Sequence, residues 1–177
     1  MGKVIFVTGG ARSGKSSHAE NLAKGFGAPL GYLATAQAFD GEMTDRIKLH
    51  QERRGPEWST IEEPLHLPQA LASHDGQCAV ILVDCLTLWL SNLLFRYEEL
   101  EENIQERILE DLQRLKTTLH DMTTPVILVS NEVGMGIVPE HPLGRMFRDL
   151  AGLANQRMAA LADEAWLVVS GIPMRLK

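Results

Sequence analysis

The chain has 177 residues, a hydrophobic fraction of 45% and a formal net charge of −6, which together suit one soluble domain with a substantial core. This acidic balance disfavours a general nucleic-acid binder, which is usually basic overall or along one stripe. The two cysteines, Cys78 and Cys85, have no metal-ligand spacing and indicate a reducing compartment. No signal peptide is recognisable and polar residues interrupt the longest apolar stretch, 79–95, so we predict a cytoplasmic protein without a membrane span.

Short runs rich in Val, Ile and Leu recur along the chain and predict strands. They cover residues 3–8, 30–34, 79–84, 125–130 and 165–169. The clearest runs are continuously apolar, as in strands that are buried on both faces of a parallel sheet. Apolar residues recur every three or four positions over 97–122 and 142–162, which predicts two helices. The alternation predicts a single α/β domain over residues 1–177, with a mostly parallel sheet and helices on both faces.

The first predicted strand leads into a glycine-rich loop. The segment VTGGARSGKSSH, residues 7–18, contains the pattern G-x-x-x-x-G-K-S at Gly9, Gly14, Lys15 and Ser16. It follows a strand and precedes a helical stretch, which is the context that a P-loop requires. In a P-loop, backbone N–H groups surround a phosphate, the lysine reaches the β- and γ-phosphates, and the serine hydroxyl ligates Mg²⁺. We therefore predict a site for a nucleoside triphosphate.

A second polar segment, EMTDRIKLHQERR at residues 42–54, is predicted to form a helix. A spacing of four places Arg46, His50 and Arg54 along one stripe of this helix. The two cations are expected to lower the pKa of His50, provided that Glu52 does not offset them, and a neutral imidazole is a nucleophile. The physics of the sequence favours a plainer alternative, in which His50 lies on a solvated basic helix end.

The strand predicted at 79–84 ends in an acidic residue. A buried carboxylate is costly unless it is paired or bound to a metal, so Asp84 is the candidate partner of Ser16 at Mg²⁺. Alternatively, Asp84 only caps the following helix. The sequences DCLT and SNEVG do not match the D-x-x-G and N-K-x-D motifs of signalling GTPases. The acidic balance also disfavours a DNA motor, so a small-molecule kinase or nucleotidyltransferase is favoured.

The stretch NEVGMGIVPEHPLGR, residues 131–145, is rich in Gly and Pro after a predicted strand, so we expect a loop near the site. Glu132 and the arginines at 145, 148 and 157 could contact a substrate phosphate or a neighbouring subunit. Asn131 and Glu132 could equally cap the strand end.

Several stretches resemble one family, the bifunctional adenosylcobinamide kinase / adenosylcobinamide-phosphate guanylyltransferase of cobalamin biosynthesis. They extend from one end of the chain to the other and include VTGGARSGKSSHAE (7–20), YLATAQ (32–37), DGEMTDRIKLHQERR (40–54), NEVGMGIVPEHPLGRMFRDLAG (131–152) and ADEAWLVVSGIP (162–173). The resemblance implies a P-loop NTPase core that is RecA-like, a homotrimer and two reactions. The first phosphorylates the aminopropanol hydroxyl of adenosylcobinamide with ATP or GTP. The second transfers GMP from GTP to that phosphate, which gives adenosylcobinamide-GDP and pyrophosphate.

The resemblance also implies roles for particular residues. The histidine of the family pattern R-I-x-x-H-x-x-x-R matches His50, which would form a guanylyl-histidine intermediate, and Lys15 would be the second catalytic residue. Mg²⁺ would be held by Ser16 and Asp84. The nucleotide contacts carry over to Gly9, Gly10, Ala11, Arg12, Ser13, Gly14, Lys15, Ser16, Ala34, Thr35, Ala36, Gln51, Glu52, Arg53, Arg54, Glu62 and Asp84.

Two other functions stay open at the level of the sequence. One is a P-loop small-molecule kinase with a single activity, in which His50 is idle. The other is a non-enzymatic switch or assembly module that responds to nucleotide on a RecA-like core. We expect neither nucleic acid nor a membrane as a partner in any of the three cases.

Overall fold

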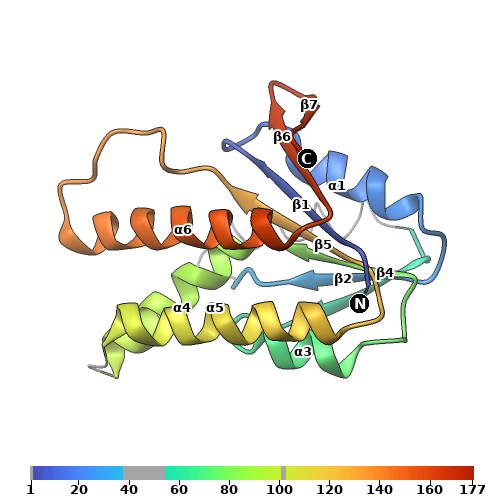
Figure 1. Ribbon diagram of the computed structural model, residues 1–177, viewed down its shortest axis with the longest axis horizontal. Coiled ribbons are helices and arrows are strands. Elements are labelled where there is room, and N and C mark those ends of the chain that lie inside the picture. The colour runs from blue at the N-terminus through green and yellow to red at the C-terminus, as the bar shows by residue number, and fades with distance from the viewer. Residues whose placement is uncertain (1, 38–54, 101–102) are drawn as a thin grey trace.

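The structure, a computed structural model, describes residues 2–37, 55–100 and 103–177 (Figure 1). Its strands form one sheet in the order β3-β2-β4-β5-β1-β6-β7, in which β6 and β7 pair antiparallel and the other neighbours pair parallel. The strands are β1 (Val4–Gly9), β2 (Leu30–Ala34), β3 (Trp58–Glu62), β4 (Val80–Asp84), β5 (Val126–Asn131), β6 (Glu164–Val169) and β7 (Ile172–Arg175). The helices are α1 (Lys15–Lys24), α3 (Leu67–Ser73), α4 (Leu86–Glu99), α5 (Ile104–Asp121) and α6 (Pro142–Leu161).

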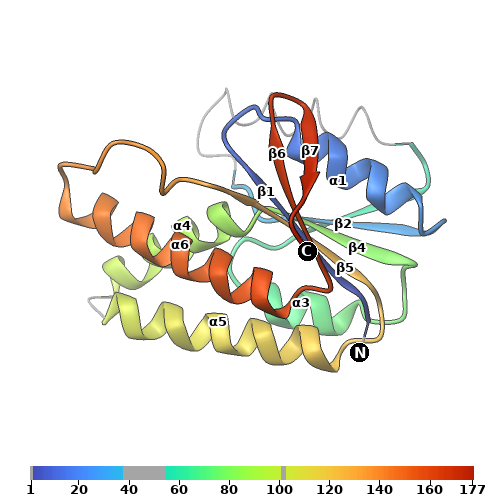
Figure 2. The same ribbon diagram turned by 45° about the horizontal axis from the view of Figure 1, so that its top comes forward.

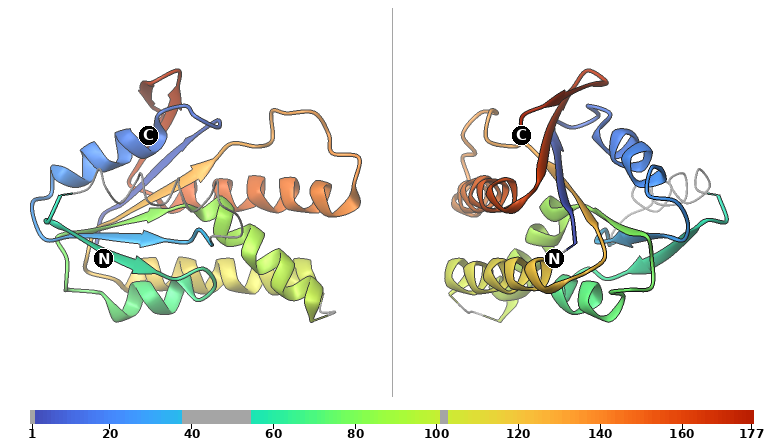
Figure 3. Two further views of the ribbon diagram at one scale, coloured as in Figure 1. Left: turned by 180° about the vertical axis from the view of Figure 1, so that it is seen from behind. Right: turned by 45° about the vertical axis from the view of Figure 1, so that its right-hand side comes forward.

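Helices cover both faces of the sheet, which confirms the predicted α/β class. Figure 3 shows α1 on one face and α5 and α6 on the other, and Figure 2 shows α3 and α4 on the same side as α5. Two buried clusters correspond to these faces. The smaller cluster includes Ala19 and Ala23 of α1, while the larger includes Trp89 of α4 and Leu112 of α5. Strands β1 and β2 are buried throughout, and β5 is buried except for its half-buried last residue, because helices cover both faces of the sheet.

The strand order places β5 between the P-loop strand β1 and the strand β4 that ends in Asp84. Because the carboxyl ends of parallel strands meet at one edge of a sheet, the ends of β1, β5, β4, β2 and β3 lie along a common edge. In open α/β sheets this edge is where ligands bind. The candidate active site is therefore a feature of this edge.

The helix predicted over 97–122 is wrong in its first part. Residues 97–99 belong to the end of α4, and α5 begins at Ile104. The prediction ran across the connection between α4 and α5 because Leu100 keeps the apolar spacing of the helix, although it is exposed. The apolar stripe of α5 is buried in the larger cluster together with residues of α3 and α4, and Tyr97 of α4 donates a hydrogen bond to Asp111 of α5. The helix predicted at 142–162 is confirmed as α6, whereas the helix predicted at 42–54 lies outside the described residues.

Asp75 joins the segment after α3 to the segment before β5. Its carboxylate accepts hydrogen bonds from the backbone N–H groups of Thr123 at 3.1 Å and Thr124 at 2.8 Å. These bonds, with that of Thr124 the largest cause, lower the pKa of Asp75 from 3.8 to about 2. The ionised carboxylate therefore stabilises the folded state.

Replacement of Asp75 by Asn is expected to lower stability at neutral pH and to flatten its dependence on acid. Because the folded-state pKa is the lower one, the contribution of Asp75 is complete above pH 3.8 and is lost as the pH falls toward about 2. Urea unfolding at a series of pH values between these limits and neutrality measures the effect. Free energies of unfolding that stay separated by a constant amount in the wild type and the variant would contradict this assignment.

Candidate active site

The phosphate loop, residues 9–16, lies between β1 and α1, as the sequence predicts. Gly14 precedes α1 with a φ of +93°, in the left-handed region that favours glycine. A Cβ atom on Gly14 would also lie only 3.2 Å from the Cα atom of Gly171. The backbone N–H of Gly171, in the β6–β7 turn, donates a hydrogen bond to the Ser13 carbonyl at 2.8 Å, so this hairpin supports the loop.

No side chain caps the N-terminus of α1. The first-turn N–H groups of this helix therefore suit an anion, because they and the helix dipole favour negative charge. Lys15 is buried and its ammonium donates a hydrogen bond to the Gly10 carbonyl at 3.1 Å, which folds the side chain back over the loop. Among the described residues, the hydroxyls of Thr8 and Ser13 are buried without a hydrogen-bond partner, which fits a loop that binds a polar ligand.

The charges of Asp84 and Lys15 both affect the pKa of the Cys85 thiol. Burial, followed by the negative charge of Asp84, raises the pKa of the Cys85 thiol to about 11, and the Lys15 cation opposes this rise. The Asp84 carboxylate, at the end of β4, accepts a hydrogen bond from the Tyr32 hydroxyl at 3.0 Å. The structure thus brings the lysine of the phosphate loop and the predicted metal ligand to one part of the sheet edge.

Three predicted nucleotide contacts form one row across the sheet. Glu62 of β3 is in register with Ala34 of β2, and Ala34 is in register with Asp84 of β4. Because adjacent strands lie about 4.8 Å apart, Glu62 is about 10 Å from Asp84 along this row. Thr35 and Ala36 follow this row, so the three strand ends lie at the same edge of the sheet as the phosphate loop.

Both the side chain and the backbone of Thr35 form hydrogen bonds within the protein. Its hydroxyl bonds the carbonyl and the N–H of Cys85, at 2.7 and 2.9 Å. Its N–H donates to the Asp84 carbonyl, and its carbonyl accepts from Asn92. These bonds fix the position of the segment after Asp84, while a nucleotide contact at residues 34–36 stays a prediction.

A buried polar network holds the end of β5 beside the phosphate loop. Asn131 is in register with Gly9, and its N–H donates to the Thr87 hydroxyl at 2.7 Å. Its carbonyl accepts from the Asn155 amide of α6 at 3.1 Å. The Ser130 hydroxyl joins the two clamps, because it donates to Asn155 at 2.6 Å and contacts Thr87 at 3.2 Å. The backbone of Asn131 is therefore held from both α4 and α6.

Only a weak signal for this network is present in the sequence. It singled out Asn131 and Glu132, but it predicted no role for Thr87 or Asn155. A polar residue at a buried position of a helix is the one signal that could have identified Asn155.

Residues 132–141, which belong to the predicted loop, connect β5 to α6 without a helix or strand, and most of them are exposed (Figure 1). Its apolar residues Met135, Ile137 and Val138 are exposed, Ile137 to 97%. Arg145 donates to the carbonyls of Pro139 and Glu140, so it braces this loop against the start of α6. This is a structural role for an arginine that the sequence left open as a phosphate ligand.

Five predicted site residues lie outside the described part of the chain: His50, Gln51, Glu52, Arg53 and Arg54. Their assignments stay predictions. Within the described ranges, no group of three or more His, Cys, Asp or Glu side chains could hold a metal ion. This is compatible with Mg²⁺, which usually takes one or two protein ligands and otherwise binds water and substrate phosphates.

In the same ranges, no helix is both long and apolar enough to span a bilayer.

The loop, the strand order and the placement of Asp84 define a P-loop NTPase with a RecA-like core. A solved structure of the RadB recombinase agrees with this class, since it matches 93% of this chain and 73% of its own with a TM-score of 0.50 at 15% identity, which shows the fold alone. The chain belongs to the family described as cobinamide kinase / cobinamide phosphate guanyltransferase, whose profile matches residues 5–176.

Curated relatives support this membership over nearly the whole chain. The bifunctional adenosylcobalamin biosynthesis protein CobU of Escherichia coli is 44% identical over 98% of this chain and 99% of its own length. CobU of Salmonella typhimurium is 45% identical over the same shares. CobP of Pseudomonas aeruginosa, which carries the same description, is 44% identical over 97% of this chain and 95% of its own.

Proposed function

We propose that this protein is a bifunctional transferase of cobalamin biosynthesis. It phosphorylates adenosylcobinamide with ATP or GTP, and it then transfers GMP from GTP to adenosylcobinamide phosphate. The observation that carries the proposal is the phosphate loop with Lys15 folded over it, at the same sheet edge as Asp84, in a chain of this family. A non-enzymatic switch that responds to nucleotide has no acceptor substrate. Turnover of adenosylcobinamide therefore separates the proposed transferase from such a switch.

In the first transfer, the aminopropanol hydroxyl oxygen of the acceptor attacks the γ-phosphorus. The bond from this phosphorus to the oxygen that bridges to the β-phosphate breaks, and the nucleoside diphosphate leaves. The loop N–H groups and Lys15 stabilise the charge that develops on the phosphate oxygens. Positioning and charge neutralisation supply most of the acceleration in such reactions, so a strong general base is not required.

In the second transfer, an imidazole nitrogen of His50 attacks the α-phosphorus of GTP and pyrophosphate leaves. The phosphate oxygen of the acceptor then attacks the same phosphorus and releases the histidine, which gives adenosylcobinamide-GDP. In this two-step route, GMP stays bound to His50 until the acceptor phosphate is in place. The family pattern around His50 is what supports this step.

Mg²⁺ fits the oxygen donors at the site. The Ser16 hydroxyl and the Asp84 carboxylate would hold it, and when bound it neutralises charge on the triphosphate. We also propose a homotrimer in the cytoplasm, for which the exposed apolar side chains of the 132–141 loop offer contact area.

The clamp on Asn131 suggests a positioning role for Asn155 in the first transfer. Asn155→Leu removes both bonds of this buried amide, so we expect a loss of about 1–3 kcal/mol in stability. It should also lower kcat for phosphorylation by about ten- to a hundred-fold, with little change in nucleotide affinity, because the strand end beside Gly9 shifts. Met158→Ala, at another buried position of the same helix, is the control, since we expect it to be destabilised at least as much while both hydrogen bonds of Asn155 remain. An equal fall in kcat in both variants would reduce Asn155 to a stabilising residue.

A kinase assay tests the proposed function directly. The protein is incubated with adenosylcobinamide, Mg²⁺ and nucleoside triphosphate labelled at the γ-phosphate, and the corrinoid is separated. The proposal predicts label in the corrinoid with one nucleoside diphosphate formed for each phosphate transferred. Release of inorganic phosphate alone, at a rate unaffected by the corrinoid, would support the nucleotide switch instead.

A further inference from the structure

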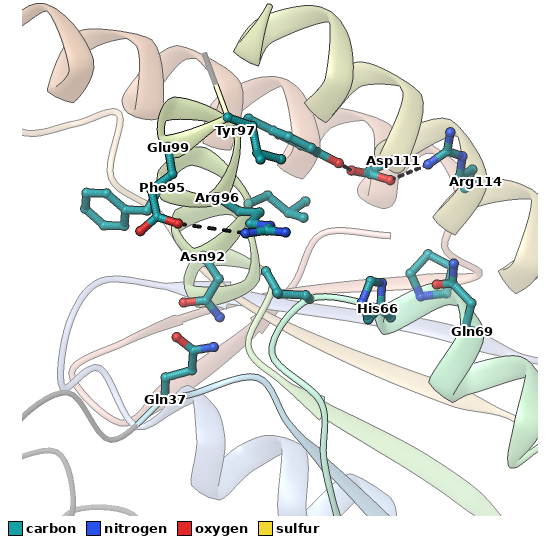
Figure 4. A pocket seen from close by; sticks show the side chains of 14 residues that line it. Gln37, His66, Gln69, Asn92, Phe95, Arg96, Tyr97, Glu99, Asp111 and Arg114 are labelled. Atoms are coloured by element: carbon teal, nitrogen blue, oxygen red, sulfur yellow. Dashed lines mark hydrogen bonds and ion pairs between the residues drawn. The ribbon is translucent and has the colours of Figure 1, made fainter. Parts of the chain in front are cut away.

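A large pocket lies away from the phosphate loop, between α3, α4 and α5 and beside the end of β2 (Figure 4). Its volume is about 780 Å³, which is within the usual range for small-molecule sites. No residue of the phosphate loop lines it. Figure 4 shows the amide groups of Gln37 and Asn92 pointing toward each other on one side, with His66 and Gln69 of the α3 region on another.

The lining combines neutral hydrogen-bonding groups with apolar surface. Gln37 and Gln69 contribute carboxamides from two different segments, and Asn92 contributes a third, whose nitrogen already donates to the carbonyls of Thr35 and Pro64. Leu65 and Phe95 contribute apolar surface, and Phe95 is 52% exposed although it is a large aromatic side chain. This combination suits a bulky ligand that carries many amides on an apolar frame.

The charged residues of the lining are already paired with one another. Arg114 donates to Asp111 at 2.9 Å, and Asp111 also accepts a hydrogen bond from Tyr97. Arg96 lies 3.9 Å from Glu99. Because each arginine of the lining lies beside a carboxylate, the pocket favours a neutral ligand over a triphosphate.

Backbone contacts connect the pocket to the active site. The Asn92 amide, which lines the pocket, donates to the Thr35 carbonyl at 2.8 Å, and Thr35 in turn bonds the backbone of Cys85 beside Asp84. Three strand spacings separate β2 from the P-loop strand β1, through β4 and β5, which is about 14 Å. A ligand in the pocket therefore needs an extended arm to present its reactive group to the phosphate loop.

We propose that this pocket holds the corrin macrocycle of the acceptor, an inference that rests on the proposed function. A corrin is an apolar ring with carboxamide side chains, which match the amide groups and the apolar residues of the lining. The hydroxyl that receives the phosphate is at the end of the aminopropanol arm, outside the ring. The ring then stays in the pocket while this arm extends along the sheet edge toward the nucleotide.

Two substitutions test the pocket, and each leaves the phosphate loop intact. Gln69→Trp fills the space from α3, and Phe95→Ala removes exposed apolar surface from α4, where the cost in stability is small. Ala72→Trp is the matched control, because Ala72 is exposed on α3 and does not line the pocket. We expect Gln69→Trp to raise the KM for adenosylcobinamide by about ten-fold or more and Phe95→Ala to raise it less, with unchanged affinity for nucleotide.

The outcomes separate the pocket from the activity. If the wild type phosphorylates adenosylcobinamide and both pocket variants keep its KM, the macrocycle binds elsewhere and the placement is overturned. An equal rise in KM in Ala72→Trp would also overturn it. If the wild type neither turns over nor binds adenosylcobinamide in equilibrium dialysis, the proposed function itself fails. Binding by the wild type that is weakened in Gln69→Trp alone among the two tryptophan variants supports the pocket.

Discussion

Replacing Lys15 by Met is expected to lower kcat for phosphorylation of adenosylcobinamide by about 10²- to 10³-fold. Lys15 is the buried cation of the phosphate loop, and its charge reaches the neighbourhood of Asp84 and Cys85. Methionine keeps the length and apolar stem of the side chain but removes the charge that would stabilise the transferring phosphoryl group. Steady-state kinetics with saturating nucleotide measure the effect.

The control for Lys15→Met is Lys24→Met on the same helix. Lys24 is exposed in the last turn of α1, so its loss changes the net charge equally without reaching the loop. Phosphorylation should be unchanged in this control. The same variants show whether one triphosphate position serves both reactions. If it does, Lys15→Met lowers formation of the GMP adduct together with phosphorylation. A kcat in Lys15→Met within a few-fold of the control would remove Lys15 from the mechanism.

Replacing His50 by Ala is expected to abolish GMP transfer, on the order of 10³-fold or more, while phosphorylation persists. The His50 imidazole would be the nucleophile that carries GMP, and we expect no other side chain to take over this role. GTP labelled at the α-phosphorus is incubated with the protein and Mg²⁺, and the denatured protein is examined for label. A histidine adduct is labile in acid and stable in base, and the wild type should show it.

His120→Ala is the matched control for this experiment, because His120 is an exposed histidine near the end of α5, next to Asp121. It should retain the label and both activities. Label that survives in His50→Ala would place the nucleophile elsewhere. Absence of any covalent label in the wild type would favour the P-loop kinase with a single activity.

The sequence predicted the centre of the fold well because burial on both faces leaves a clear pattern. The strands that became β1, β2, β4, β5 and β6 were each predicted to within a residue or two. The two edge strands were missed. No residue of β3 is buried and every residue of β7 is exposed, so neither shows a continuous apolar run, and β7 also contains Pro173.

The phosphate loop could be predicted because its chemistry is local, within eight consecutive residues. The rest of the site depends on pairings between distant segments. Register alone aligns Glu62 with Asp84, and the clamp on Asn131 joins residues 24 positions apart in the chain through Asn155. The pocket beside β2 depends on the break between α4 and α5, which the continuous apolar period concealed.

The most direct test of the central claim, two successive transfers by one chain, is the mass of the corrinoid product formed with GTP as the sole nucleotide. The purified protein is incubated with adenosylcobinamide, GTP and Mg²⁺, and the corrinoids are analysed over time. We predict that a species heavier by one phosphate appears first and is converted to one heavier by a further GMP, with GDP formed in the first step and pyrophosphate in the second. Accumulation of the phosphorylated corrinoid alone, without pyrophosphate, or no change in the corrinoid at all, would contradict it.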